Sequence, residues 1–218
     1  MTARQQFDNL LSDLANKLFD LGQLVERQID VAVSSLGQQD LEAANQILAG
    51  DKQVNRLQAE IEDSCMLLIA TQQPLARDLR KIVAAFKISI YLERMGDLAV
   101  DVAKVTLRIG AAKLIKPLID IPRMSELVRQ MVSTGIKAYV EEDATAATSM
   151  SAVDDQVDHL YSQIFRELLV IMLEDPKTIS QANYLLFAAR FLERMGDYCT
   201  NIAEETVYVV TGRRSELN

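Results

Sequence analysis

The sequence predicts an all-α fold, a tandem duplication of an antiparallel three-helix bundle with six long helices. Only 8 Gly and 4 Pro occur among 218 residues, whereas turn-rich β folds need a turn roughly every 8–12 residues. Apolar residues recur at spacings of three and four, the period of an amphipathic helix. The segment LERMGD also occurs twice, at 92–97 and at 192–197.

The two copies extend beyond LERMGD. The pattern DxQVxxL begins at Asp51 and again at Asp154, an offset of 103, while the two LERMGD segments differ by 100. The discrepancy falls around Pro74 and Pro176, and insertions collect in connections between duplicated units. We therefore expect a first bundle at 1–112, a connection at 113–122 and a second bundle at 123–218.

The first half is predicted to contain three helices. The first carries an apolar stripe and ends near Gly37, and Asp40 is placed to cap the second. The second helix stops before Pro74, and the third runs from near Leu75 to about Gly110. The stripe of the first helix consists of Phe7, Leu10, Leu11, Leu14, Leu18, Leu21 and Val25. Short connections make such helices antiparallel neighbours.

The second half repeats this arrangement, with helices expected near 123–140, 143–173 and 177–210. Pro117 and Pro122 lie in the expected connection between the halves. The residues from Thr211 onward are expected to be a frayed tail.

Acidic residues interrupt the predicted apolar stripes at matching places in both halves. In the third helix the stripe through Phe86 and Ile90 continues onto Glu93 and Asp97, one helical turn apart. Antiparallel packing could bring these acids against acids of the preceding helix. The first candidate set is Asp51, Asn55, Glu93, Asp97 and Asp101. The second is Asp154, Asp158, Glu193, Asp197 and Asn201.

Each set holds four carboxylates and one amide, which need a positive charge if they converge. A bound cation, nearby arginines such as Arg94 and Arg194, or protonation could supply it. A metal fits best, and all-oxygen ligands suit hard cations such as Mg, Mn, Ca or iron. The single histidine, His159, cannot supply the paired Glu-x-x-His motifs of a di-iron bundle.

Composition excludes several other classes of function. With 23 basic and 31 acidic residues the net charge is −8, which argues against nucleic acid or an anionic membrane surface as a partner. The start of the chain has no signal-peptide pattern, and no apolar run is long enough for a membrane span. Cys65 and Cys199 are isolated in sequence, as expected for a reduced cytoplasmic protein.

The duplicated ERMGD, the acidic partners from Asp51 and Asp154, and the segment NIAEETVYVVTGR after Asp197 together resemble the PhoU family of phosphate-uptake regulators. The resemblance covers essentially the whole chain. It implies two three-helix bundles side by side, with metal at the E(D)xxxD motifs. The cation it implies is iron, manganese, magnesium or zinc. Asn55 stands where the motif has its second acid.

The resemblance further implies a non-enzymatic cytoplasmic adaptor that lowers phosphate uptake and phosphate-starvation signalling. Its expected partners are the ATP-binding subunit of the Pst phosphate transporter, the phosphate-sensing histidine kinase and a second copy in a homodimer. Contact with a membrane would be indirect, through these partners. Two alternatives stay open, a carboxylate-bridged metalloenzyme and a purely structural helical interaction protein.

Overall fold

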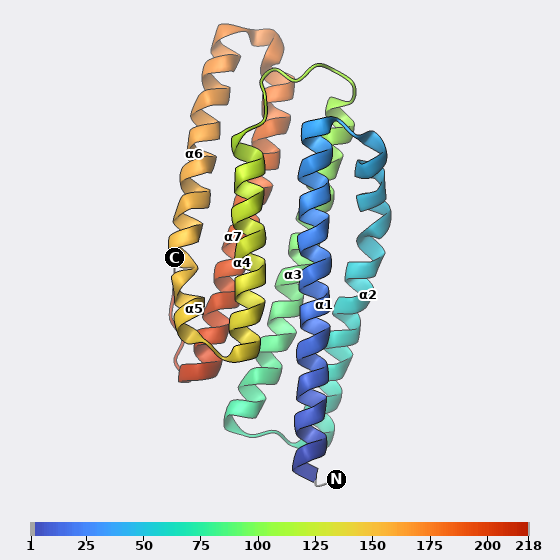
Figure 1. The fold of residues 1–218 in the computed structure, drawn as a ribbon, viewed down its shortest axis with the longest axis vertical. Helices are drawn as coiled ribbons and strands as arrows, with labels where there is room; N and C mark the ends of the chain where they lie inside the picture. Colours follow the sequence, from blue (N-terminus) through green and yellow to red (C-terminus); the bar gives the residue numbers. More distant parts are fainter. Residues whose placement is uncertain (1–2, 218) are drawn as a thin grey trace.

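A computed structural model describes residues 3–217, which contain helices and no β-strand. The helices form two three-helix bundles that stand side by side (Figure 1). The first consists of α1 (Ala3–Gln38), α2 (Leu41–Gln72) and α3 (Ala76–Ile109). The second consists of α4 (Asp120–Glu141), α5 (Ala144–Ser149), α6 (Ser151–Glu174) and α7 (Ile179–Thr211), with a 3₁₀ turn η1 (Pro176–Thr178) before α7. The predicted fold class is confirmed.

Equivalent aspartates begin the second helix of each half. The Asp40 side chain accepts hydrogen bonds from the backbone N–H groups of Glu42 and Ala43. Asp143 accepts equivalent bonds two and three residues further on. Each aspartate satisfies N–H groups that a helix start would otherwise leave unpaired, so the predicted cap at Asp40 is confirmed.

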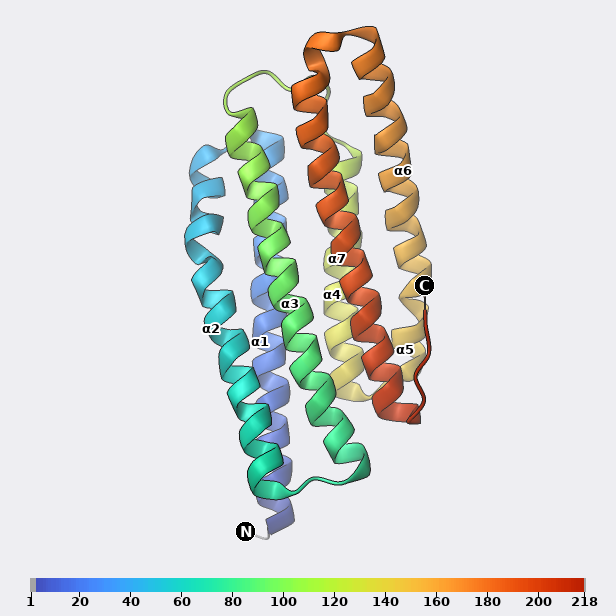
Figure 2. The ribbon, with the colours of Figure 1, turned by 180° about the vertical axis from the view of Figure 1, so that it is seen from behind.

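Three sequence-based expectations about element ends are wrong. The helix expected at 143–173 is split at Met150, whose N–H reaches Ala147 and tightens the turn there. The fourth helix begins at Asp120, so Pro122 lies in its first turn, where the missing N–H costs no hydrogen bond. The tail is not frayed over residues 213–217, which turn back so that the backbone N–H of Leu217 donates to Glu204 of α7 (Figure 2).

The core follows the predicted stripe of α1. Leu14, Leu18, Leu21 and Val25 are buried, and the buried face continues to Ile29. In α2 the buried face carries Ile47, Val54, Ile61 and Leu68, again at helical spacing.

Two helix pairs join the bundles, α3 with α7 and α1 with α4. Gly22 on α1 lies so close to α4 that a Cβ at this position would overlap Ile136. The helices α3 and α7, which carry the two LERMGD copies, run side by side in opposite directions (Figure 2). Within the described chain, every helix is too polar or too short for a bilayer span.

Candidate functional site

The first acidic cluster lies between α2 and α3. Burial raises the pKa of the Glu93 carboxyl, and the negative charges of Asp97 and Asp51 raise it further. Burial also raises the pKa of Asp97, with Asp51 as the next cause. The structure therefore brings these three carboxyl groups within electrostatic reach of one another, as the antiparallel packing of α2 on α3 predicts.

Polar partners surround this first cluster. Arg94 lies 3.5 Å from Glu93 and 3.6 Å from Asp97. Lys104 pairs with Asp101 at 2.8 Å. At the outer edge, the Asn55 amide donates to Asp51 at 3.3 Å.

The second cluster lies between α6 and α7 and is more deeply buried at its centre. Asp154 is only 5% exposed. Burial raises its pKa to about 7, with further contributions from the charges of Asp158 and Asp197 and smaller ones from Asp155 and Glu193. A buried carboxyl among like charges resists ionisation, so Asp154 changes charge near neutral pH.

Close helix packing creates this environment. A Cβ on Gly196 would come within 2.6 Å of Asp154 Oδ1, so glycine is what allows the carboxylate to lie against the backbone of α7. In the first half the corresponding Gly96 faces Val54 instead, at 3.1 Å. The two motifs are thus alike in sequence but differ in what packs on their glycines.

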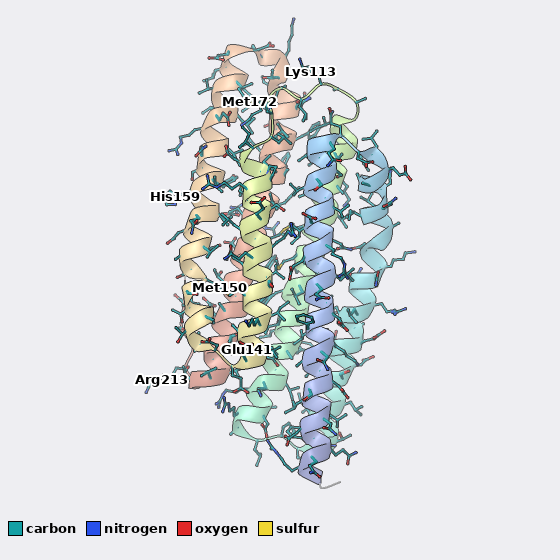
Figure 3. All side chains as sticks on the ribbon, viewed as in Figure 1. Lys113, Glu141, Met150, His159, Met172 and Arg213 are labelled. Carbon is teal, nitrogen blue, oxygen red and sulfur yellow. The ribbon has the colours of Figure 1, made fainter. Side chains whose placement is uncertain are left out.

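The arginine that pairs with the second cluster is Arg190, which donates to Glu193. Burial raises the pKa of the Asp197 carboxyl, and the charges of Arg190 and, to a smaller extent, Arg194 oppose this rise. Asn201 is partly buried one turn beyond Asp197. His159 lies on the outer side of α6, where its ring contacts its own helix at Asp155 O (Figure 3).

The acids of α3 do not interrupt its core stripe, contrary to expectation. The fully buried face of α3 carries Ile82, Ala85, Leu92 and Ala99, whereas Leu79 is 38% exposed. Because α1, α2 and α7 all pack on α3, its buried face is wide and carries both small and large residues. Of the apolar residues that precede Glu93, Ile82 is buried, Phe86 and Ile90 are partly buried and Leu79 is exposed. The acids lie at the edge of this buried face.

The oxygen donors of both clusters suit a hard cation, but the side chains are not arranged closely enough to coordinate one. One oxygen of Asp51 and one of Glu193 are buried without a hydrogen-bond partner, as oxygens awaiting a cation would be. However, among residues 3–217 no three His, Cys, Asp or Glu side chains are grouped closely enough to bind a metal. The carboxylates pair with cationic side chains instead. The pairs are Asp97 with Arg94, Asp101 with Lys104 and Glu193 with Arg190.

Two buried polar side chains were missed by sequence reasoning. Gln28 is 4% exposed, and its Oε1 lies 3.4 Å from the position of a Cβ on Gly96. Glu205 is buried between the bundles and accepts from Lys87 at 2.6 Å. Each could have been found as a polar residue at a core position of its helix, three residues after Val25 and Ile202 respectively.

Arg80 of α3 lies against the C-terminal end of α7. Its guanidinium lies near the Tyr208 ring, 5.9 Å from the centroid, and donates weakly to Val209 O at 3.4 Å. The C-terminal end of α7 carries the partial negative charge that this cation meets.

The fold and the two acidic clusters define a class of protein, tandem three-helix bundles that carry duplicated carboxylate motifs. The family model of the PhoU domain matches this chain twice, at residues 18–106 and 121–206. The chain therefore belongs to the PhoU family.

Individual relatives match along nearly the whole chain. A protein of Clostridium acetobutylicum named phosphate-specific transport system accessory protein PhoU homolog is 39% identical over 216 residues, 99% of each chain. Its namesake from Caulobacter vibrioides is 39% identical, over 93% of this chain and 88% of that protein.

Solved structures agree with the fold. PhoU from Pseudomonas aeruginosa superimposes with a TM-score of 0.90 at 35% identity, covering 95% of this chain and 100% of that one. The phosphate transport system regulatory protein PhoU from Streptococcus pneumoniae gives a TM-score of 0.89 at 31% identity, covering 96% and 99%.

Proposed function

We propose that this protein is a non-enzymatic accessory regulator of phosphate-specific transport, which lowers phosphate uptake and phosphate-starvation signalling when phosphate is plentiful. The observation that carries this proposal is the match to a phosphate-specific transport accessory protein over 99% of both chains. The proposed partners are the ATP-binding subunit of the Pst transporter and the phosphate-sensing histidine kinase. The proposed location is the cytoplasm, with the protein acting as a homodimer.

Metal binding is the second part of the proposal. The carboxylates of the two clusters would bind a hard cation, with Glu93, Asp97, Glu193 and Asp197 as the principal ligands. The chemistry supplied by the cation would be charge neutralisation, which lets acids on neighbouring helices pack together. The unpartnered buried oxygens of Asp51 and Glu193 support this assignment.

Deletion of the gene tests the regulatory part. We expect phosphate-responsive genes and phosphate uptake to rise in phosphate-replete medium, and the wild-type gene to restore repression. Unchanged expression and uptake after deletion would contradict the proposal. Turnover of a substrate by the metal-loaded protein, abolished by Glu93→Gln, would instead support a metalloenzyme.

Binding of metal is tested separately on the purified protein. Adding Mn²⁺, Mg²⁺ or Fe²⁺ after chelation should raise the melting temperature, because a ligand that binds only the folded state stabilises it. The Glu193→Ala/Asp197→Ala variant should lose most of this rise, whereas Glu60→Ala/Glu62→Ala on exposed or partly exposed positions of α2 should keep it. No bound metal on elemental analysis and no thermal shift would contradict a cation site.

A further inference from the structure

The contact between α3 and α7, here called the seam, has two ends that correspond to each other. Near the start of α3, Lys87 meets Glu205 of α7. Near the end of α3, Arg108 lies 5.9 Å from the Tyr184 ring of α7. Because α3 and α7 are antiparallel, residue numbers increase along α3 in the direction in which they decrease along α7. The two helices are also copies of one sequence at an offset of 100 residues. One end is therefore the counterpart of the other.

At the first end, here called the closed end, the side chain of Arg214, from the segment after α7, reaches the acid of the seam. Arg214 stacks over Tyr208 at 4.5 Å and lies 3.5 Å from Glu205. The backbone N–H of Leu217 donates to Glu204 at 2.9 Å. A basic, extended segment of the chain thus lies against an acidic and aromatic surface.

At the second end, the seam is open. A cavity of about 210 Å³ lies there. Phe187 is 51% exposed, although its ring stacks on Phe191 at 6.2 Å. A half-exposed aromatic ring beside a cavity favours burial by another molecule. The cavity is lined by Asp101, Lys104, Val105, Arg108, Phe187 and Phe191.

The charge of the open end is the reverse of that at the closed end. The corresponding residues are Glu204 and Lys104, Glu205 and Val105, and Tyr208 and Arg108. At the open end, Lys104 and Val105 thus stand where the closed end has two acids. Arg108 stands where the closed end has Tyr208 and contributes a second cation. Since Asp101 already pairs with Lys104, Arg108 is the cation available to an anionic group.

We propose that the open end of the seam binds an acidic peptide segment of a partner protein. A carboxylate of the segment would pair with Arg108, and an apolar or aromatic side chain would cover Phe187. At the closed end, the cation of Arg214 pairs with Glu205 beside the Tyr208 ring, and the proposed segment would make equivalent contacts with the charges exchanged. The inference does not depend on the regulation of phosphate uptake.

A random peptide library displayed on phage is the probe, with the full-length protein as bait. We expect enriched peptides to be rich in Asp and Glu and to contain an aromatic or large apolar residue. This outcome is diagnostic because the net charge of −8 would by itself favour basic peptides. Binding of the best enriched peptide is then measured by fluorescence anisotropy.

Two matched double variants locate the site. Phe187→Ala/Arg108→Glu should weaken binding by about tenfold or more, because it removes both the ring and the cation. Phe165→Ala/Arg166→Glu changes an equally exposed pair on α6 and should leave binding unchanged. Circular dichroism checks that both variants fold. Enrichment of basic peptides, no enrichment, or equal binding by both variants would overturn the proposal.

Discussion

Asp154 shows at the scale of a residue how the fold controls charge. Its carboxyl group is buried against Gly196, among the charges of Asp158 and Asp197. The unfolded chain would expose the same group to water, where an aspartate has a pKa of about 3.9. In the folded protein the pKa is raised to about 7, so folding binds a proton over the intervening range.

This pKa shift predicts a pH-dependent stability of the metal-free protein. The stabilising contribution of protonated Asp154 is complete below about pH 4 and is lost as the pH rises to about 7, because the folded state binds the extra proton. We expect the free energy of unfolding to fall by on the order of 1–3 kcal/mol over this range. Urea denaturation with a chelator present measures it.

Asp154→Asn provides the comparison. The variant has no carboxyl group to titrate at this position and should show a smaller slope than the wild type, so that it exceeds the wild type in stability at pH 8. Asp155→Asn, at an exposed neighbouring position, should keep the wild-type slope. Identical slopes in the wild type and Asp154→Asn would exclude Asp154 as the titrating group.

The sequence was informative about which acids gather but not about how deeply each is buried. The repeat and the four-residue spacing were enough to place Glu93 with Asp97 and Glu193 with Asp197. The burial of Asp154 depends on the approach of α6 to Gly196, and the exposure of Leu79 depends on which helices pack around α3. Both are set by tertiary packing, which the pattern of one helix does not contain. Whether the clusters bind metal stays a prediction.

At the scale of elements, glycine decides how closely α1 and α4 approach. Gly22 lies in the interior of α1, where glycine costs about 1 kcal/mol relative to alanine. The cost is offset by close packing, because Ile136 of α4 occupies the space of the missing side chain.

Gly22→Ala should therefore destabilise the protein despite its better helix propensity. We expect a loss of about 1–3 kcal/mol, since a methyl group added here forces the buried Ile136 side chain out of its packed position. Gly37→Ala is the matched control on the same helix, because nothing lies within 4 Å of its Cβ position. Urea denaturation of both variants measures the difference, and equal stabilities would contradict close packing of α1 on α4.

Most element ends could be predicted because their signals are local. Asp40, Pro74 and Gly110 each lie at the end of a helix as expected. The break at Met150 carries neither proline nor glycine, so no local signal marks it. The return of the tail depends on Arg214 finding Tyr208 and Glu205, which are contacts of the folded molecule. The division into domains at 112 and 123 stays a prediction.

For the whole molecule, the seam couples the two bundles through a buried charge. Glu205 has one carboxylate oxygen without a partner, and the other accepts from Lys87. Removing Lys87 would leave this buried charge with only the more distant and largely exposed Arg214 as a partner, which costs more than the Lys87 pair contributes.

Lys87→Met should consequently lower the free energy of unfolding by about 1–3 kcal/mol. The double variant Lys87→Met/Glu205→Leu should recover much of the loss, because it removes the buried charge as well. Arg56→Met breaks an exposed pair with Glu60 and should change stability by less than about 0.5 kcal/mol. Additive effects of the two seam substitutions would show that they do not interact.

The unequal ends of the seam also determine which half can pair with which. Two first halves placed face to face would set Lys87 against Val105, and two second halves would set Phe187 against Glu205. Either homotypic pair would bury a charge against an apolar side chain, whereas the observed pair matches cation with acid and ring with valine. The two bundles thus differ in the residues that they bring to their contact, and we expect a chain of two identical copies to assemble less stably than this one.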